Sequence, residues 1–120
     1  MNDFAGDEIR AKYPCFVVAP QCPKEQKWVD GTWSASTHDM PAQAAGPLRL
    51  AMEAIAGLEK EFSIDPDRIY VTGLSMGGYG TWDAAARYPG RFAAAAPICG
   101  GGDPAQAGKI APIPLWVFHG

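Results

Sequence analysis

A serine held between two glycines constrains the fold of this chain more than any other feature. The stretch VTGLSMGGYG at residues 71–80 contains the pattern G-x-S-x-G as Gly73-Leu74-Ser75-Met76-Gly77. An apolar run precedes the pattern, and Tyr79 and Trp82 follow it on one helical face. The pattern predicts a sharp turn from a strand into a helix, with Ser75 projecting at the carboxyl edge of a parallel sheet.

The residue types around Ser75 fit nucleophilic chemistry. Residues two before and two after such a serine approach neighbouring backbone, so we expect Gly73 and Gly77 to be required and Gly78 to add room. The start of the helix directs unpaired N–H groups and its positive dipole end towards the serine. We therefore interpret Ser75 as a nucleophile and the Met76 N–H as one oxyanion donor. A glycine-rich turn with an incidental serine stays open as the alternative. A phosphate loop is disfavoured, because its spacing and its lysine are absent.

The rest of the chain alternates short apolar runs with helical periodicity. The predicted strands are Cys15–Ala19, Ile69–Thr72, Phe92–Ile98 and Pro114–Phe118. Apolar residues recur at helical spacing from Leu48 to Phe62, and the sequence YPG at 88–90 ends the helix that follows Ser75. This order predicts an α/β fold with a parallel sheet of about four strands, covered by helices on both faces.

Composition limits the function classes. The 120 residues allow at most one domain, and the net charge of −3 offers no basic footprint for nucleic acid. No apolar run approaches the roughly 20 residues that span a bilayer. Met1–Arg10 has no apolar core, so we predict no signal peptide there and leave the compartment open. The three cysteines favour free or buried thiols, although a Cys15–Cys22 bridge stays open, and we expect no metal or other cofactor.

Three stretches resemble a known family. They are KYPCFVVAPQCP (12–23), DPDRIYVTGLSMGGYGTWDAAARYPGRFAAAAPICGG (65–101) and IPLWVFHG (113–120). These stretches resemble the predicted-peptidase branch of the α/β-hydrolases, close to phospholipase/carboxylesterase and polyhydroxybutyrate-depolymerase-like esterases. The resemblance implies a serine hydrolase that cleaves carboxylic esters or peptides through an acyl-enzyme. It also implies that Ser75 is the nucleophile and that Met76 supplies an oxyanion N–H.

The chain also departs from that family. Such hydrolases have a core sheet of about eight strands and a Ser…Asp/Glu…His chain order. In relatives, the triad aspartate and later the histidine follow the HG at 119–120, and an earlier HG loop gives the second oxyanion donor. None of these is found in the sequence. We therefore expect residues 1–120 to be a single incomplete domain, the central portion with the serine turn. We expect it to need its missing flanking segments and to be inactive alone.

Four residues are candidates to replace the missing triad members. His119 is interpreted as ending a strand, and His38 as a solvated or substrate-lining loop residue. Asp103 starts the sequence DPAQ and is interpreted as a helix N-cap. Asp83 lies two turns into the helix after Ser75, where we expect a solvated face.

Three functions remain in competition. The leading hypothesis is a serine esterase with a small-molecule ester substrate, and the second is a serine peptidase of the same fold. The third, of another class, is a non-catalytic binding module that retains the serine turn as a relic. A nucleotide or phosphate binder is disfavoured, since no lysine or acidic ribose partner is in position.

Overall fold

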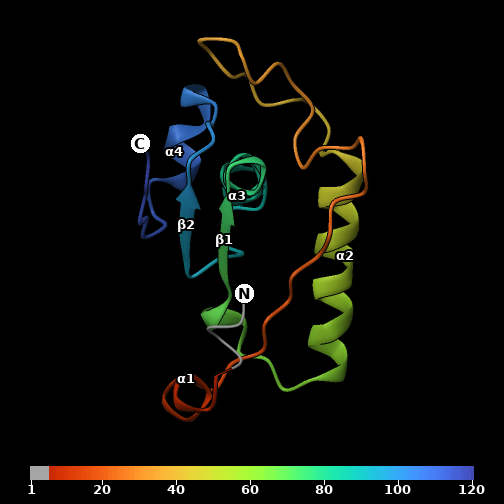
Figure 1. Ribbon diagram of the computed structural model, residues 1–120, viewed down its shortest axis with the longest axis vertical. Coiled ribbons are helices and arrows are strands. Elements are labelled where there is room, and N and C mark those ends of the chain that lie inside the picture. Colours follow the sequence, from red (N-terminus) through yellow and green to blue (C-terminus); the bar gives the residue numbers. More distant parts are fainter. Residues whose placement is uncertain (1–5) are drawn as a thin grey trace.

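The computed structural model describes residues 6–120 as a small parallel sheet with helix α3 (Met76–Arg87) packed against one face (Figure 1). In chain order the elements are α1 (Asp7–Lys12), α2 (Gly46–Glu61), η2 (Pro66–Arg68), β1 (Tyr70–Leu74), α3 (Met76–Arg87), β2 (Ala94–Ile98), η3 (Pro104–Gln106) and α4 (Ala107–Ile110). The prediction that Met1–Arg10 is no signal peptide falls partly on residues 1–5, which lie outside the described residues. No helix within residues 6–120 is long and apolar enough to cross a membrane.

The two strands pair in parallel around the predicted turn. The register runs from Tyr70 opposite Ala94 to Leu74 opposite Ile98. Parallel strands need a crossover connection, and α3 supplies it. Ala85 is completely buried where α3 packs on the strands, because its small side chain allows a close approach. The predicted order of strand, turn, helix and strand is confirmed, with strand bounds slightly different from the predicted ones.

The segment 114–118, predicted as a strand, is joined to β2 by two isolated parallel bridges. The Ala95 N–H donates to the Pro114 carbonyl at 3.0 Å, and the Cys99 N–H donates to the end of the segment at 2.8 Å. The donor between these two would be residue 97, and proline has no N–H. Pro97 therefore removes the middle hydrogen bond of the ladder. The sheet has two strands instead of the predicted four or so.

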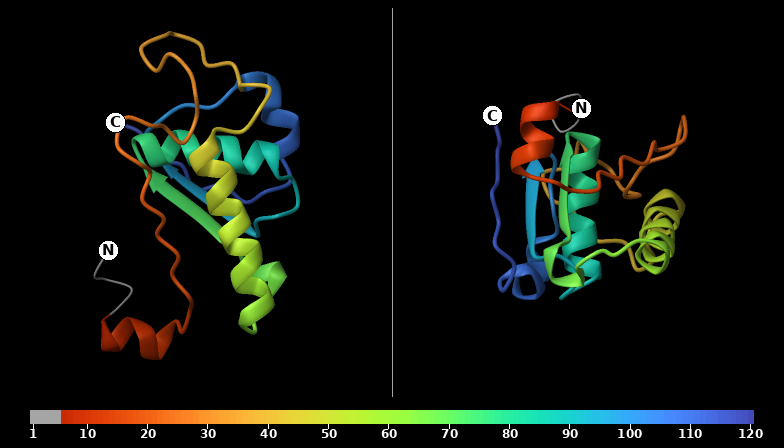
Figure 2. Two further views of the ribbon diagram at one scale, coloured as in Figure 1. Left: turned by 90° about the vertical axis from the view of Figure 1, so that its right-hand side faces the viewer. Right: turned by 90° about the horizontal axis from the view of Figure 1, so that it is seen from below.

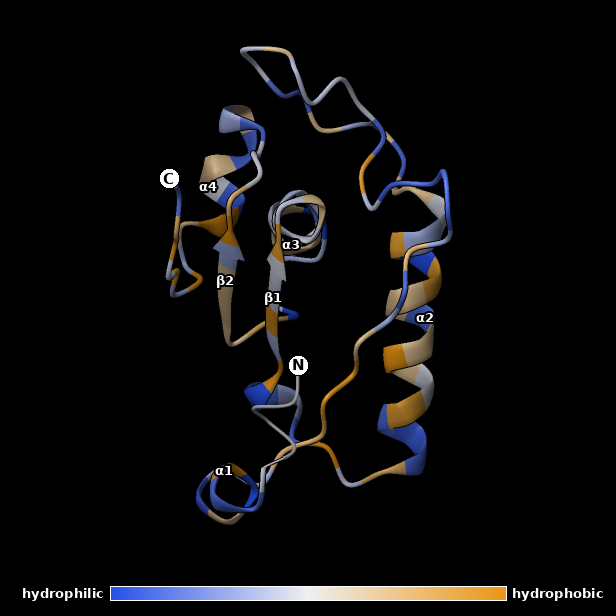
Figure 3. Ribbon diagram, in the orientation of Figure 1, coloured by the Kyte–Doolittle hydropathy of each residue, from blue (hydrophilic) through white to orange (hydrophobic). Residues whose placement is uncertain are grey.

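The run Cys15–Ala19 is exposed coil, so the prediction of a buried strand is wrong. Phe16 is 62% exposed and contacts Phe62 just beyond the end of α2, with ring centroids 5.3 Å apart. Figure 3 shows the run as a hydrophobic stretch of coil leading away from α1. A strand needs a hydrogen-bonded neighbour, and within residues 6–120 no strand pairs with this run. Its β-branched composition alone does not make it a strand.

The sheet is covered on one face and open on the other. Helix α3 and the loop of residues 21–45 lie on the same side of the strands, where Ala95 is buried (Figure 2). On the opposite face Tyr70 is 64%, Leu74 is 66% and Trp116 is 71% exposed. Trp116 packs there on Phe118, with ring centroids 5.1 Å apart. The prediction of cover on both faces is therefore wrong for the described chain. We call the side of the sheet formed by Tyr70, Leu74, Trp116 and Phe118 the open face.

Helix α2 carries the predicted apolar stripe. Leu48 is buried, and Met52 packs with it against a cluster that includes Phe92. Figure 3 shows hydrophobic residues along the side of α2 that faces the rest of the chain. Farther along the helix, Glu59 accepts a 2.8 Å hydrogen bond from Arg91, which follows α3. These contacts hold α2 beside α3 and complete the covered side of the sheet.

Candidate functional site

Ser75 lies in the turn between β1 and α3, as predicted. Its φ of 55° and ψ of −108° are unusual for a residue with a side chain and cost on the order of 1–3 kcal/mol. The backbone is fixed on both sides, because the Ser75 N–H donates to the Ile98 carbonyl at 2.8 Å and the Ser75 carbonyl accepts from Gly78 at 2.8 Å. The Ser75 side chain is exposed and does not cap α3, although a serine at a helix start commonly does.

Met76 is the first residue of α3, so its N–H has no acceptor within the helix. The neighbouring N–H groups of Gly78 and Tyr79 both donate to the Ser75 carbonyl, at 2.8 and 3.2 Å. The first turn of the helix is thus closed behind Ser75 by its own backbone. The Met76 N–H is left at the positive end of the helix dipole, beside the exposed serine.

Two of the three predicted glycines are required by close contacts. A Cβ atom at Gly73 would overlap the Gly77 carbonyl, and one at Gly78 would overlap the Cys99 carbonyl. Gly77 differs, since a Cβ atom there would meet nothing within 4 Å. The expectation that Gly77 must be small is therefore wrong for the described chain, because a Cβ atom at this position meets open space. Gly78 is the residue that lets α3 approach the end of β2.

We predict opposite outcomes for alanine at the two neighbouring glycines. Gly78→Ala should lower the free energy of unfolding by about 3 kcal/mol, because the new methyl displaces backbone at Cys99. Gly77→Ala should change it by less than about 1 kcal/mol, since alanine favours the helix and meets open space. Thermal unfolding of the two variants, purified as the whole protein, measures the difference, and equal melting temperatures would contradict the close packing at Gly78.

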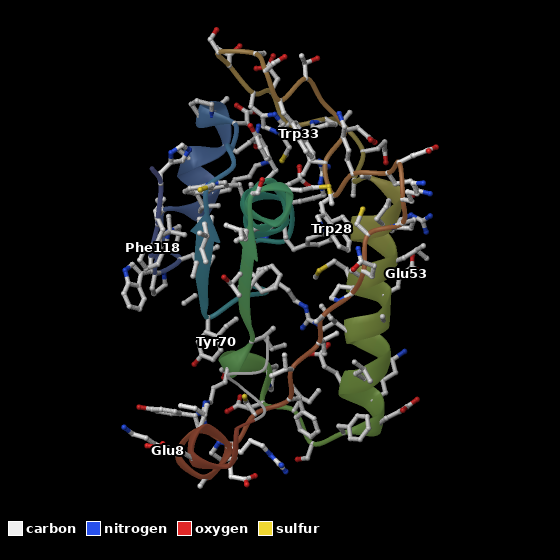
Figure 4. The ribbon with its side chains drawn as sticks, viewed as in Figure 1. Glu8, Trp28, Trp33, Glu53, Tyr70 and Phe118 are labelled. Atoms are coloured by element: carbon white, nitrogen blue, oxygen red, sulfur yellow. The ribbon has the colours of Figure 1, made fainter. Side chains whose placement is uncertain are left out.

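An aromatic cluster lies on the first turn of α3. Trp33 stacks on Tyr79 with ring centroids 5.0 Å apart, and His38 meets the same ring edge-on at 5.4 Å. The Tyr79 hydroxyl donates to the Trp33 carbonyl at 3.3 Å, and the Lys27 ammonium lies 4.7 Å from the Trp33 ring centre. Figure 4 labels Trp33 over α3. Sequence alone does not indicate that the loop carrying Trp33 contacts Tyr79, because the two residues are 46 apart along the chain.

None of the four candidate triad residues, which all lie within residues 6–120, is in contact with Ser75. His38 lies against the Tyr79 ring, and His119 is exposed with its Nδ1 3.0 Å from the Gly120 carbonyl. Asp103 caps η3, as predicted, by accepting from the Ala105 N–H at 2.8 Å. Its other carboxylate oxygen accepts from the Met40 N–H at 3.0 Å. The hydrogen bonds from Met40 and Ala105 hold the pKa of Asp103 below its ordinary value.

Asp83 is buried, so the expectation of a solvated face is wrong. Its side chain is 2% exposed and forms a two-point ion pair with Arg87, at 2.8 and 2.9 Å. Arg87 also donates to the carbonyls of Pro41 and Ala42, at 2.7 and 3.3 Å. Helical spacing alone did not reveal this role, because the loop that covers α3 comes from residues far away in the sequence. The pair ties that loop to the helix.

We predict that Asp83→Ala lowers the free energy of unfolding by about 3 kcal/mol, because it leaves the largely buried Arg87 without its carboxylate. Glu53→Ala is the matched control, since Glu53 also pairs with an arginine four residues away but is 58% exposed. That control should cost only about 0.5 kcal/mol. Urea denaturation of the whole protein measures both, and a similar loss for the two variants would contradict the buried role of Asp83.

A cavity of about 350 Å³ lies between α3, α4 and the loop of residues 38–40. His38, Met40, Trp82 and Asp103 are among its lining residues, whereas Ser75 is not. Within residues 6–120 no three His, Cys, Asp or Glu side chains are grouped to hold a metal ion. All three cysteines are free thiols, so Cys15 and Cys22 do not pair.

Comparisons with known proteins agree with this fold. A 46% identical protein of known structure, described as a thermostable esterase, superposes on 97% of this chain with a TM-score of 0.85. Poly(3-hydroxyalkanoate) depolymerase C of Paucimonas lemoignei is 51% identical over 49 residues, 41% of this chain. A bifunctional acetylxylan esterase/xylanase of Neocallimastix patriciarum is 34% identical over 91 residues, 75% of this chain.

The chain spans only part of each of these proteins. It covers 30% of the esterase of known structure, 12% of the depolymerase and 13% of the acetylxylan esterase/xylanase. The predicted fold class is confirmed as a partial α/β-hydrolase fold. The model of the prolyl oligopeptidase family matches residues 48–115, which include the Ser75 turn and more than half of the chain. The chain belongs to the prolyl oligopeptidase family of α/β-hydrolases.

Proposed function

We propose that the whole protein is a serine hydrolase that cleaves carboxylic esters through an acyl-enzyme formed at Ser75. The observation that carries the proposal is the backbone of Ser75, whose positive φ presents an exposed hydroxyl that does not cap the helix behind it. Strain at a residue of this kind is characteristic of functional sites. A serine without a catalytic role at a helix start would stabilise the helix by capping it. The absence of such a cap at Ser75 therefore disfavours the alternative of a glycine-rich turn with an incidental serine.

In the proposed reaction, the Ser75 hydroxyl oxygen attacks the ester carbonyl carbon while a base removes its proton. The Met76 N–H donates to the oxyanion that forms, and the alcohol leaves with the proton. Water then attacks the acyl-enzyme and releases the acid. Serine is a weak nucleophile without a positioned base. We propose that the triad acid and base and the second oxyanion donor come from flanking segments of the same domain, of which residues 1–120 form the central portion.

Esters are favoured as substrates by the similar proteins, which are described as an esterase, a polyester depolymerase and an acetylxylan esterase. A peptidase is the second candidate, because the family whose model matches is named for oligopeptide cleavage. A binding module that keeps the turn as a relic is the third. The strained backbone of Ser75 disfavours the binding module, because a protein without catalytic activity does not need this energetically costly conformation.

Two hydrolysis assays and one labelling experiment on the whole protein separate these candidates. We expect hydrolysis of p-nitrophenyl acetate, little hydrolysis of peptide p-nitroanilides, and fluorophosphonate labelling that maps to Ser75. Faster cleavage of the anilides would overturn the ester assignment in favour of a peptidase. Absence of both labelling and turnover would overturn catalysis and favour the binding module.

A further inference from the structure

Asp65 and Asp103 both cap a short 3₁₀ helix, and Asp103 also forms a long-range hydrogen bond. Asp65 and Asp103 each precede a proline and cap a short 3₁₀ helix, with almost equal backbone angles (φ −77° and −79°). Each accepts a hydrogen bond from the backbone N–H two residues ahead, at 3.0 and 2.8 Å. Asp65 makes no other side-chain hydrogen bond within residues 6–120. Asp103 alone also accepts from Met40, 63 residues away.

The Met40 contact holds the loop that carries the aromatic cluster. The second Asp103 oxygen accepts from the Met40 N–H at 3.0 Å and from the Gln106 side chain at 3.2 Å. His38, two residues before Met40, packs edge-on against Tyr79, and Trp33 stacks on the same ring. Asp103 thus fixes the end of the segment 33–40 at Met40, and the other end is held where Trp33 stacks on Tyr79.

This segment packs on Tyr79, whose N–H donates to the Ser75 carbonyl at 3.2 Å. A side chain on a helix leans towards the helix N-terminus, and for Tyr79 that is the direction of the turn that begins at Ser75. Trp33 and His38 flank that ring, and Gly101, after β2, lies against it at 3.2 Å from its would-be Cβ atom. Together Trp33, His38 and Tyr79 form an aromatic wall on the first turn of α3, the helix that begins directly after the exposed Ser75.

We propose that Asp103 is a positioning residue for this aromatic wall, and that the wall binds the apolar or aromatic group of the ester cleaved at Ser75. The inference rests on the proposed ester hydrolysis and adds a substrate preference to it. Asp103 holds Met40, Met40 holds the segment 33–40, and the segment keeps the rings in place. A substrate long enough to reach the wall benefits from this order, and an acetyl ester does not.

The test compares Asp103→Ser with Asp65→Ser in the whole protein. Serine keeps a capping oxygen in both variants but is too short to reach Met40. KM is measured for p-nitrophenyl acetate and for p-nitrophenyl 3-phenylpropanoate, which adds an aryl group to the acyl chain. We expect Asp103→Ser to raise KM for the phenylpropanoate about fivefold or more, with kcat and the acetate KM within about twofold. Asp65→Ser should leave the ratio of the two KM values unchanged.

Hydrogen exchange of the backbone amides in 33–40 supplies a readout independent of activity. It should accelerate in Asp103→Ser, which loses the acceptor for the Met40 N–H, but not in Asp65→Ser. Faster exchange with an unchanged KM ratio would overturn the substrate role, and unchanged exchange would overturn the positioning role. A wild-type protein without esterase activity, or activity retained in Ser75→Ala, would instead overturn the proposed function.

Discussion

Ser75→Ala in the whole protein is expected to lower kcat for ester hydrolysis by a factor of about 10⁴ or more, because the acyl-enzyme cannot form. The free energy of unfolding should change little. The Ser75 hydroxyl is exposed and does not cap α3, so its removal deletes no structural hydrogen bond of that helix. The bonds that fix the turn are made by the backbone, which alanine retains.

Turnover of p-nitrophenyl acetate and thermal unfolding of the same purified preparation measure the two effects. Thr72→Ser is the matched control, since Thr72 is an exposed hydroxyl residue on β1 that donates to the Ala96 carbonyl at 2.6 Å. It should retain esterase activity, because serine keeps that hydroxyl. Wild-type rates in Ser75→Ala would remove Ser75 from the mechanism and leave its strained backbone without a catalytic explanation.

The serine turn was predictable from sequence because its pattern of residue types is local, although Gly78 is required by a contact with the distant Cys99. Gly73 and Gly78 are needed where backbones meet, and both lie within three residues of Ser75. The cap at Asp103 was predictable for the same reason, as its acceptor and donor are two residues apart. Such features depend on short-range geometry that residue types determine.

The errors arose where distant segments decide the outcome. Asp83 was expected in solvent, yet its partner Arg87 donates to the Pro41 carbonyl, which belongs to a loop 46 residues before Arg87. The strand prediction for 114–118 overlooked Pro97 on the neighbouring strand, which interrupts the ladder. Cys15–Ala19 has strand composition but no hydrogen-bonded neighbour within residues 6–120. In each case the residue pattern of one segment did not determine its structure, because a second segment, distant in the sequence, decides which contacts it makes.

The open face leads to the last prediction, that the 120-residue chain expressed alone associates and hydrolyses no ester. Tyr70, Leu74, Trp116 and Phe118 are 43–71% exposed on one side of the sheet. Fully burying one large apolar side chain contributes about 1.5–3 kcal/mol, so contact between two open faces is strongly favourable. Within residues 6–120 the outer edge of β1 is unpaired as well, and an unpaired edge is a template for another strand.

Sedimentation velocity at micromolar concentration measures the association, and p-nitrophenyl acetate measures the activity. Trp116→Lys should reduce association, because it places a charge on the open face. Leu50→Lys is the matched control, since Leu50 is 57% exposed on α2, away from that face, and should leave association unchanged. A monomeric chain with a cooperative unfolding transition would contradict the role of the open face. Ester turnover by that monomer, lost in Ser75→Ala, would require a base among residues 1–120, and His38, already against the Tyr79 ring, would be the first to substitute.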